Sequence, residues 1–289
     1  MLTRPRAVSL AASCAIAALT GCTDLGQHGF GGAAATRDAN SVLSIVTGPS
    51  PQEAAAWMID AYDADKRYRG TLLIANAPWG GGPQYLSIYR AKLNPEMKHE
   101  SGLSLYDEDP LGRAAAVRGL ALHGSPEDVP VIVTQIKSEN EHLRWECVRA
   151  LQRLHNPVAI RPLLIRLDES EEDNPDIRAD AATALGQYAE NRVLDGLFAA
   201  LNDRDLAVNT AALNSLRTLT GQDLGFNRRQ WVVWAGQTEA HFAGRTPYEY
   251  PVFHRDPGIL EIIVPWMHVP NEVAAAPVGM TAQSADTGS

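Results

Sequence analysis

The middle of the chain repeats one pattern of polar, small and apolar positions. Each copy starts with a side chain that can cap a helix and carries arginine, or once asparagine, four residues later. Small residues dominate positions seven and ten after the cap, and leucine stands at position eleven in four of the five copies. These offsets share one face of an α-helix. The pattern therefore predicts five helices with caps at Asp65, Asp109, Asn140, Asn174 and Asp205.

A second helix is predicted after each first one, and the three middle copies show the pattern. Nineteen residues after the arginine stands an aliphatic residue, and another follows four residues later. These pairs are Ile132 with Ile136, Leu163 with Leu167, and Leu197 with Leu201. A capping box at Ser50 begins an earlier helix, which we expect to bury Trp57, Met58 and Tyr62. We therefore predict an all-α fold, an α-solenoid of about five helix pairs over residues 50–243.

The repeated pattern also carries a family resemblance. The cap, the arginine four residues later and the Ala-x-x-Ala-Leu spacing resemble the HEAT repeat, in the short bacterial form also called HEAT-like from the bilin lyases. The resemblance covers residues 65 to about 240 and is best in the three middle copies. In the outer copies Asn76 replaces the leucine and Asn209 replaces the arginine, as terminal repeats usually do.

The resemblance implies a role for the polar columns. In the HEAT family the cap and arginine columns form a hydrogen-bonded ladder between successive repeats. By resemblance, Asp109, Arg113, Arg144 and Arg178 are therefore interpreted as structural. A row of arginines that binds a ligand is the alternative interpretation.

The chain changes character after the last repeat. Trp231 and Trp234 lie three residues apart on one face of a predicted helix. We interpret this helix as a cover for the open end of the stack; an exposed aromatic platform for sugar or peptide is the alternative. Closely spaced prolines and apolar side chains predict that residues 244–271 form an extended strap along the solenoid. Residues 272–289 are predicted to be a disordered tail.

The N-terminal residues resemble a bacterial lipoprotein signal. Arg4 and Arg6 precede a 13-residue apolar run from Ala7 to Leu19, and Thr20-Gly21-Cys22 follow it. The run is too short to span a bilayer. The resemblance implies that residues 1–21 are removed, that Cys22 carries the lipid and that residues 22–49 form a flexible tether. An ordinary cleaved signal with a chance cysteine, or a buried N-terminal helix, remains the alternative.

Charge and cysteine content narrow the choice of partners. The chain has a net charge of −9, and removal of residues 1–21 would take away two arginines and no acidic residue. This acidity argues against nucleic acid and against anionic lipid surfaces as binding partners.

The cysteine content argues against a disulfide. With Cys14 in the signal and Cys22 lipidated, only Cys147 remains, so no intrachain disulfide is expected. Cys147 falls in the small-residue column, where a buried thiol is inert.

No catalytic motif stands out. The eight histidines form no His-Glu-x-x-His pair, and the chain has no Gly-x-Ser-x-Gly elbow, Walker-type loop or Cys-x-x-Cys. We interpret the glycine-rich residues 79–83 as a turn, with an anion site as the alternative. We interpret the acidic run at residues 168–174 as a solvated loop between repeats, with calcium binding as the alternative. We therefore expect no enzyme activity, no metal site and no cofactor.

These features predict a lipid-anchored envelope protein, facing the periplasm or the cell surface, that binds another envelope protein as a scaffold. Solenoids present a long surface of second helices to partners. The candidate partner-binding residues are Gln135, Arg161, Arg166, Asp195 and Arg228, with Trp231 and Trp234. One alternative is a glycan- or cell-wall-binding structural protein that uses the two tryptophans. Another is a ligand-handling enzyme related to the bilin lyases, against which the export signal argues.

Overall fold

The computed structural model describes residues 49–98, 102, 104–252 and 273–280. The expected signal, Cys22 and nearly all of the tether lie outside these residues, as do residues 253–271 of the strap. The described residues form α-helices with short 3-10 turns and no strand beyond isolated bridges. The helices are α2 (Pro51–Met58), α3 (Ala64–Ala75), α4 (Pro83–Leu93), α5 (Pro110–His123), α6 (Val129–Gln135), α7 (Glu141–Arg153), α8 (Ile160–Leu167), α9 (Pro175–Leu185), α10 (Asn191–Ala200), α11 (Leu206–Thr220) and α12 (Arg228–Gln237).

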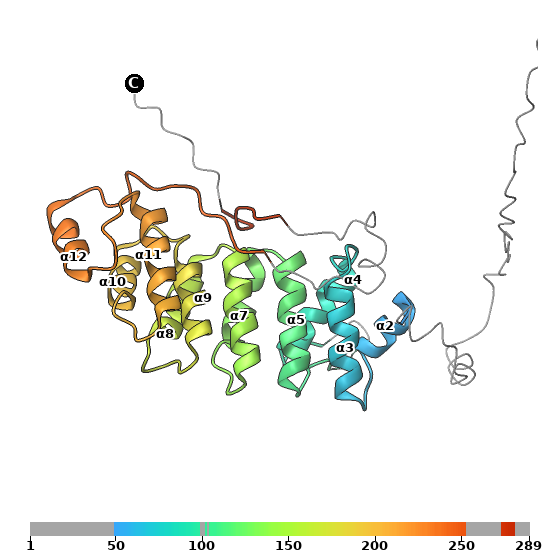
Figure 1. Cartoon of the computed structure of the whole chain (residues 1–289). Helices are drawn as coiled ribbons and strands as arrows, with labels where there is room; N and C mark the ends of the chain where they lie inside the picture. The colour runs from blue at the N-terminus through green and yellow to red at the C-terminus, as the bar shows by residue number, and fades with distance from the viewer. Residues whose placement is uncertain (1–48, 99–101, 103, 253–272, 281–289) are drawn as a thin grey trace, which may run out of the picture. The chain divides into compact units, whose positions relative to one another are not determined.

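The helices pack in sequential pairs and confirm the predicted solenoid. The first helices α3, α5, α7, α9 and α11 stand side by side in one layer, and each packs on the next (Figure 1). The second helices α4, α6, α8 and α10 pack behind them, each on the first helix that follows it in the chain. At the ends, α2 packs on α3 and α12 packs on α10.

The small-residue and leucine columns form the core between the two layers. Ala116, Cys147 and Ala181 are fully buried. At the next positions of this face, a Cβ atom on Gly119 would lie 2.7 Å from the ring of Tyr89, so only glycine lets α4 approach α5 this closely. The leucines of the middle copies, including Leu151, are also fully buried.

Four of the five caps are confirmed, and the first is shifted. Asp109, Asn140, Asn174 and Asp205 each accept a hydrogen bond from the first turn of their helix. The first copy is capped by Asp63 instead of Asp65. The sequence offers the spacing Asp-x-x-x-Arg twice here, and the exposed pair of Asp65 and Arg69 is only a surface contact.

Burial decides between these two registers. With Asp63 as the cap, Gly70 and Ile74 take the core positions seven and eleven, and both positions are buried against the neighbouring helices.

The loop after α2 corrects one further expectation. Met58 is buried as predicted, but α2 ends there, and Tyr62 in the following loop is 98% exposed.

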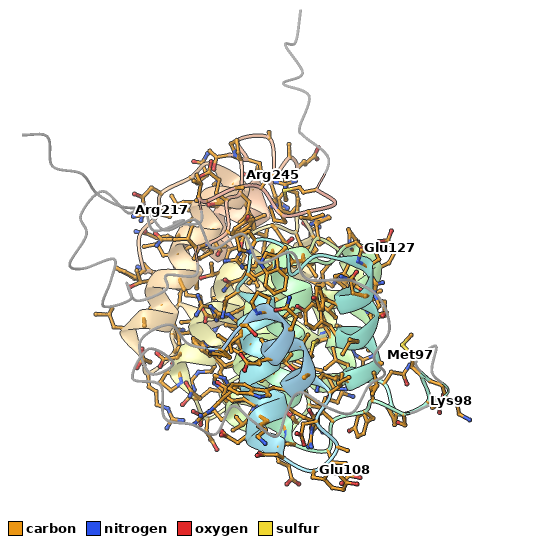
Figure 2. The ribbon with its side chains drawn as sticks, turned by 90° about the vertical axis from the view of Figure 1, so that its right-hand side faces the viewer. Met97, Lys98, Glu108, Glu127, Arg217 and Arg245 are labelled. Carbon is orange, nitrogen blue, oxygen red and sulfur yellow. The ribbon has the colours of Figure 1, made fainter. Side chains whose placement is uncertain are left out.

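The described part of the strap lies across the ends of the first helices (Figure 1). Arg245 donates a hydrogen bond from Nη2 to the carbonyl of Gln187 (3.0 Å), and the Thr246 amide donates to the carbonyl of Thr218 (2.8 Å). Tyr248 is buried. Figure 2 looks along the stack and shows Arg245 at the edge opposite Glu108. Residues 244–252 thus contact the ends of the first helices.

The prediction of a disordered tail is wrong for residues 273–280. The amide of Val278 donates to the carbonyl of Arg153 (2.8 Å), and the amide of His155 donates to the carbonyl of Val278 (2.9 Å). Pro277 is buried. The small, low-complexity composition predicts disorder. The segment is instead held by the backbone pairing of Val278, by a hydrogen bond from the Tyr250 amide to the carbonyl of Ala275 (3.0 Å) and by the buried Pro277.

Gly279 makes this docking sensitive to a single substitution. Its φ of +88° disfavours other residues, and an added Cβ would lie 2.3 Å from Cγ of Pro126. In Gly279→Val we expect the segment to detach and the amides of His155 and Val278 to lose protection from hydrogen exchange. Because the helix core is untouched, the free energy of unfolding should fall by only about 1 kcal/mol. Unchanged protection of both amides would contradict this assignment.

Candidate protein-binding site

The arginine column ties neighbouring repeats together. Arg144 donates from Nη1 to the carbonyls of Ser138 (3.0 Å) and Glu139 (2.9 Å), just before its own helix. Its Nε and Nη2 donate to both carboxylate oxygens of Glu172, at 2.7 and 2.8 Å, just before α9. We call each such arginine with the carboxylate that precedes the next first helix a rung.

Two further rungs repeat this geometry. Arg178 is 1% exposed and binds Asp203 through Nε (2.8 Å) and Nη2 (2.9 Å). Arg67 binds Asp107 in the same way, at 3.1 and 3.0 Å, and Lys92 adds a contact of 2.8 Å. Each bidentate pair fixes the position of one repeat against the next. The structural interpretation of Arg144 and Arg178 is therefore confirmed.

The carboxylates of the rungs were not predicted from the sequence. Asp107, Glu172 and Asp203 each stand two residues before a cap. Each also accepts a hydrogen bond from the amide of that cap. The same carboxylate therefore stabilises both the turn before its helix and the contact with the preceding repeat. An acidic residue at cap minus two in three copies was the signal that could have identified them. Glu172 lies in the run considered for calcium, and its buried carboxylate is held by Arg144 and Arg166.

The arginines keep the rung carboxylates ionised. Burial by itself raises the pKa of Glu172, but the hydrogen bonds from Arg144 and from the Asn174 amide outweigh it, so the pKa lies below its ordinary value. The same balance of burial against arginine hydrogen bonds lowers the pKa of Asp107 and of Asp203. These groups therefore bind fewer protons in the folded chain than in the unfolded chain.

A pH dependence of stability follows from the sign of these shifts. A carboxylate with a lowered pKa stabilises the fold above its unfolded pKa, about 4, and this contribution disappears as the pH falls through the folded pKa. We expect Glu172→Gln to cost about 2 kcal/mol at pH 7 and much less at pH 3, measured by urea unfolding. Glu146 and Asp180, whose pKa values burial raises, titrate in both proteins and cancel in the difference. An equal cost at both pH values would contradict the rung.

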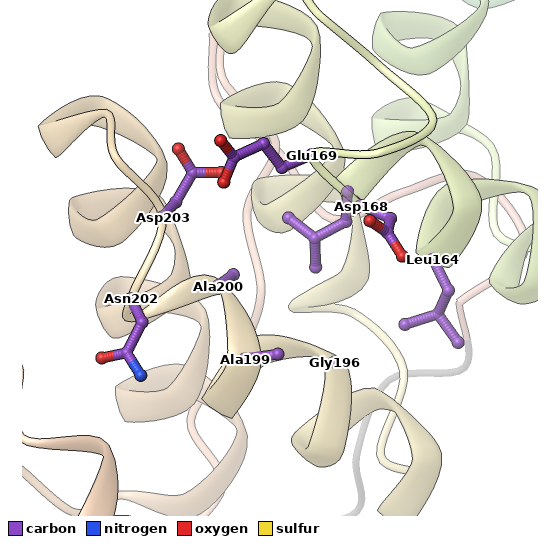
Figure 3. A pocket seen from close by; sticks show the side chains of 9 residues that line it. Leu164, Asp168, Glu169, Gly196, Ala199, Ala200, Asn202 and Asp203 are labelled. Atoms are coloured by element: carbon purple, nitrogen blue, oxygen red, sulfur yellow. The ribbon is translucent and has the colours of Figure 1, made fainter.

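The face of the second helices carries a cleft between α8 and α10. Its volume is about 250 Å³. Leu164 and Leu167 contribute apolar surface from α8, and Ala199 contributes it from α10. Figure 3 shows the carboxylates of Glu169 and Asp203 pointing toward each other at one end. The cleft therefore combines an apolar wall with an end where Glu169, paired with Arg204, and Asp203, paired with Arg178, lie.

The predicted partner-binding residues divide into two groups. Arg161 and Asp195 are exposed on the second helices α8 and α10, and Arg228 is exposed at the start of α12. Arg166 is 11% exposed and is held by Glu172 at 3.1 Å, so it supports a rung and is not a surface contact. Gln135 is half-buried and donates to the carbonyl of Leu93 (3.0 Å).

The tryptophans do not form a surface platform. Trp231 is fully buried, donates from Nε1 to the carbonyl of Gly225 (2.7 Å) and packs against Phe198. Trp234 is half-buried and meets Trp231 edge to face, with ring centroids 6.0 Å apart. The proposal of Trp231 as a partner-binding residue is therefore wrong, and α12 closes the stack. Sequence reasoning missed the exposed apolar side chains near this end, Phe226, Val232 and Val233.

Other candidate sites take structural positions. Residues 79–82 form the turn between α3 and α4. Cys147 is a buried free thiol, and burial raises its pKa well above the ordinary value. Within the described ranges, no group of three or more His, Cys, Asp and Glu side chains is placed to hold a metal ion. Among the same residues, no helix is both long and apolar enough to cross a bilayer.

The fold and the rungs define the class of protein, an all-α solenoid of paired helices. A family model of HEAT repeats matches residues 102–174, which span α5 to α8. These residues are HEAT repeats within the solenoid. Comparison with curated protein sequences gave no match. The crystal structure of YibA from Escherichia coli is similar, with 18% sequence identity and a TM-score of 0.46, over 64% of this chain and 63% of that chain. The match thus spans less than two thirds of YibA.

Proposed function

We propose that the protein is a non-catalytic scaffold that binds another protein on its second helices and is held at a cell-envelope membrane by a lipid on Cys22. Proteins with HEAT-repeat solenoids typically bind protein partners on such surfaces. The observation that carries this proposal is the exposed cleft between α8 and α10, set in a stack whose repeats are fixed to one another by rungs.

The lining of the cleft indicates the chemistry of the partner segment. Leu164, Leu167 and Ala199 offer apolar contact, and the exposed Asp168 places a carboxylate beside them. Glu169 also lines the cleft but is paired with Arg204. Asp195 stands one turn before Ala199 on the same helix face. A lysine or arginine side chain suits this lining, because its aliphatic stem packs on apolar surface and its charged end meets carboxylates. The partner segment is therefore expected to be basic.

Photo-crosslinking in cells tests the binding face. p-Benzoylphenylalanine at Ala199, in the cleft, should capture a discrete partner in the native host. The same group at Thr210, exposed on the first helix α11, is the matched control and should not. Asp195→Arg should weaken the cleft adduct, because it places a positive charge where the partner carries one. Equal capture at Ala199 and Thr210, or an adduct insensitive to Asp195→Arg, would contradict the proposed face.

Metabolic labelling tests the anchor separately. The wild-type protein grown with radiolabelled palmitate should carry the label and sediment with membranes. Cys22→Ser should lose the label and move to the soluble fraction, because the remaining sequence would offer no acyl chain. Label that persists in Cys22→Ser, or an unlabelled wild-type protein, would remove the lipid anchor from the proposal.

A further inference from the structure

One arginine of the column, Arg113, has no carboxylate of a described residue opposite it. Arg113 donates from Nη1 to the carbonyls of Asp107 (2.8 Å) and Glu108 (3.1 Å), as the other rung arginines donate to the residues before their helices. Its Nε is buried and has no hydrogen-bond partner among the described residues. This is the atom that, in Arg67, Arg144 and Arg178, donates to the carboxylate of the next repeat.

The sequence explains the difference. The residue two before the next cap, Asn140, is Ser138, where the other repeats carry Asp107, Glu172 and Asp203. Ser138 still accepts the hydrogen bond from the Asn140 amide (3.2 Å). It therefore retains the local turn but cannot supply the negative charge. Its neighbour Glu139 is exposed, and no described hydrogen bond or ion pair joins its carboxylate to Arg113.

The guanidinium of Arg113 is nonetheless held in place. Besides the two carbonyls, Nη1 donates to the hydroxyl of Tyr106 (3.2 Å), and the guanidinium lies 5.4 Å from the centre of the Tyr106 ring. The guanidinium edge formed by Nε and Nη2 thus has the orientation in which the other rung arginines bind a carboxylate. A buried N–H donor without a hydrogen-bond partner lowers the stability of the fold, which indicates that a partner is missing.

We propose that Arg113 is a docking point for a carboxylate supplied by an aspartate or glutamate side chain of the bound protein. The partner's carboxylate takes the place that Asp107, Glu172 and Asp203 take in the other rungs. This proposal rests on the proposed scaffold function and adds a specific anchor to it. The docking point lies where a second helix leads into the next first helix, as does Asp168 of the cleft. Arg113 and the exposed carboxylates of Asp168 and Asp195 thus present opposite charges in different repeats, which would set the direction in which a partner lies.

Arginine side-chain NMR tests the site with acetate as the probe. In the full-length protein, the Nε–Hε signal of Arg113, assigned with Arg113→Lys, should shift saturably when acetate replaces chloride at constant ionic strength. The signals of Arg144 and Arg178 should not move, because their donors are already paired. No shift at Arg113, or a shift no larger than that of the exposed Arg204, would overturn the proposal.

Ser138→Asp is the decisive variant, because it supplies the carboxylate within the chain. It should raise the melting temperature by about 2–4 °C, move the Arg113 signal toward those of Arg144 and Arg178, and abolish the response to acetate. Ser138→Ala is the matched control and should keep that response. An acetate response that survives in Ser138→Asp would overturn the site. That outcome would leave the scaffold proposal standing, because crosslinking at Ala199 does not depend on Arg113.

Discussion

Arg178→Ala is expected to destabilise the protein by about 3–5 kcal/mol, because removal of one partner of a buried ion pair leaves the other charge buried and uncompensated. Arg178 and Asp203 have side chains only 1% and 3% exposed. The substitution also leaves the carbonyls of Glu172 and Asp173 without their donor. Urea unfolding followed by circular dichroism measures the loss.

Arg204→Ala is the matched control for this prediction. Arg204 contacts Glu169 at 2.6 Å, but the two side chains are 67% and 42% exposed. Exposed pairs contribute little, so the cost should be below about 1 kcal/mol. Similar costs for Arg178→Ala and Arg204→Ala would mean that burial of the rung does not determine its contribution.

Trp231→Ala is expected to cost about 3–5 kcal/mol, the range for removal of a large buried aromatic side chain. The substitution removes contacts with Phe198 and Trp234 and the hydrogen bond to Gly225. Because α12 packs on α10 through this residue, the loss should appear first as increased hydrogen exchange in α12. Urea unfolding and exchange together measure the effect.

Val233→Ala provides the comparison on the same helix. Val233 is 49% exposed, so its truncation should change the free energy of unfolding by no more than about 0.5 kcal/mol. A small effect of Trp231→Ala, close to that of Val233→Ala, would mean that the end of the stack is not closed by Trp231. The result also bears on glycan binding, since loss of binding in Trp231→Ala would report unfolding of α12 and not a removed contact.

The repeat architecture could be predicted from sequence because it rests on periodicity. Small residues such as Ala116 and Cys147 recur at helical spacing. Because the same spacing appears in several copies, each copy supports the prediction made from the others. The cap of the first copy is predicted wrongly, because Asp63–Arg67 and Asp65–Arg69 have the same spacing. Only packing against α2 distinguishes the two. Periodicity predicts a helix face better than it predicts a boundary.

The polar site was harder to predict, because its partners lie in different repeats. Arg144 was identified from its column, but Glu172 stands 28 residues later in an acidic run that also resembled a solvated loop. Helical spacing alone predicts Arg166 on the surface, whereas its ion pair with Glu172 depends on the course of the loop after α8. The docking of residues 273–280 depends on backbone pairing with Arg153 and His155, which composition does not encode.

The central claim is that rungs couple neighbouring repeats into one stack, and a double-mutant cycle on Arg178 and Asp203 tests it most directly. Urea unfolding of Arg178→Ala, Asp203→Ala and the double variant gives the coupling energy between the two side chains. We predict a coupling of about 2 kcal/mol, because the pair is buried and bidentate. Additive losses, with a coupling below about 0.5 kcal/mol, would contradict the account.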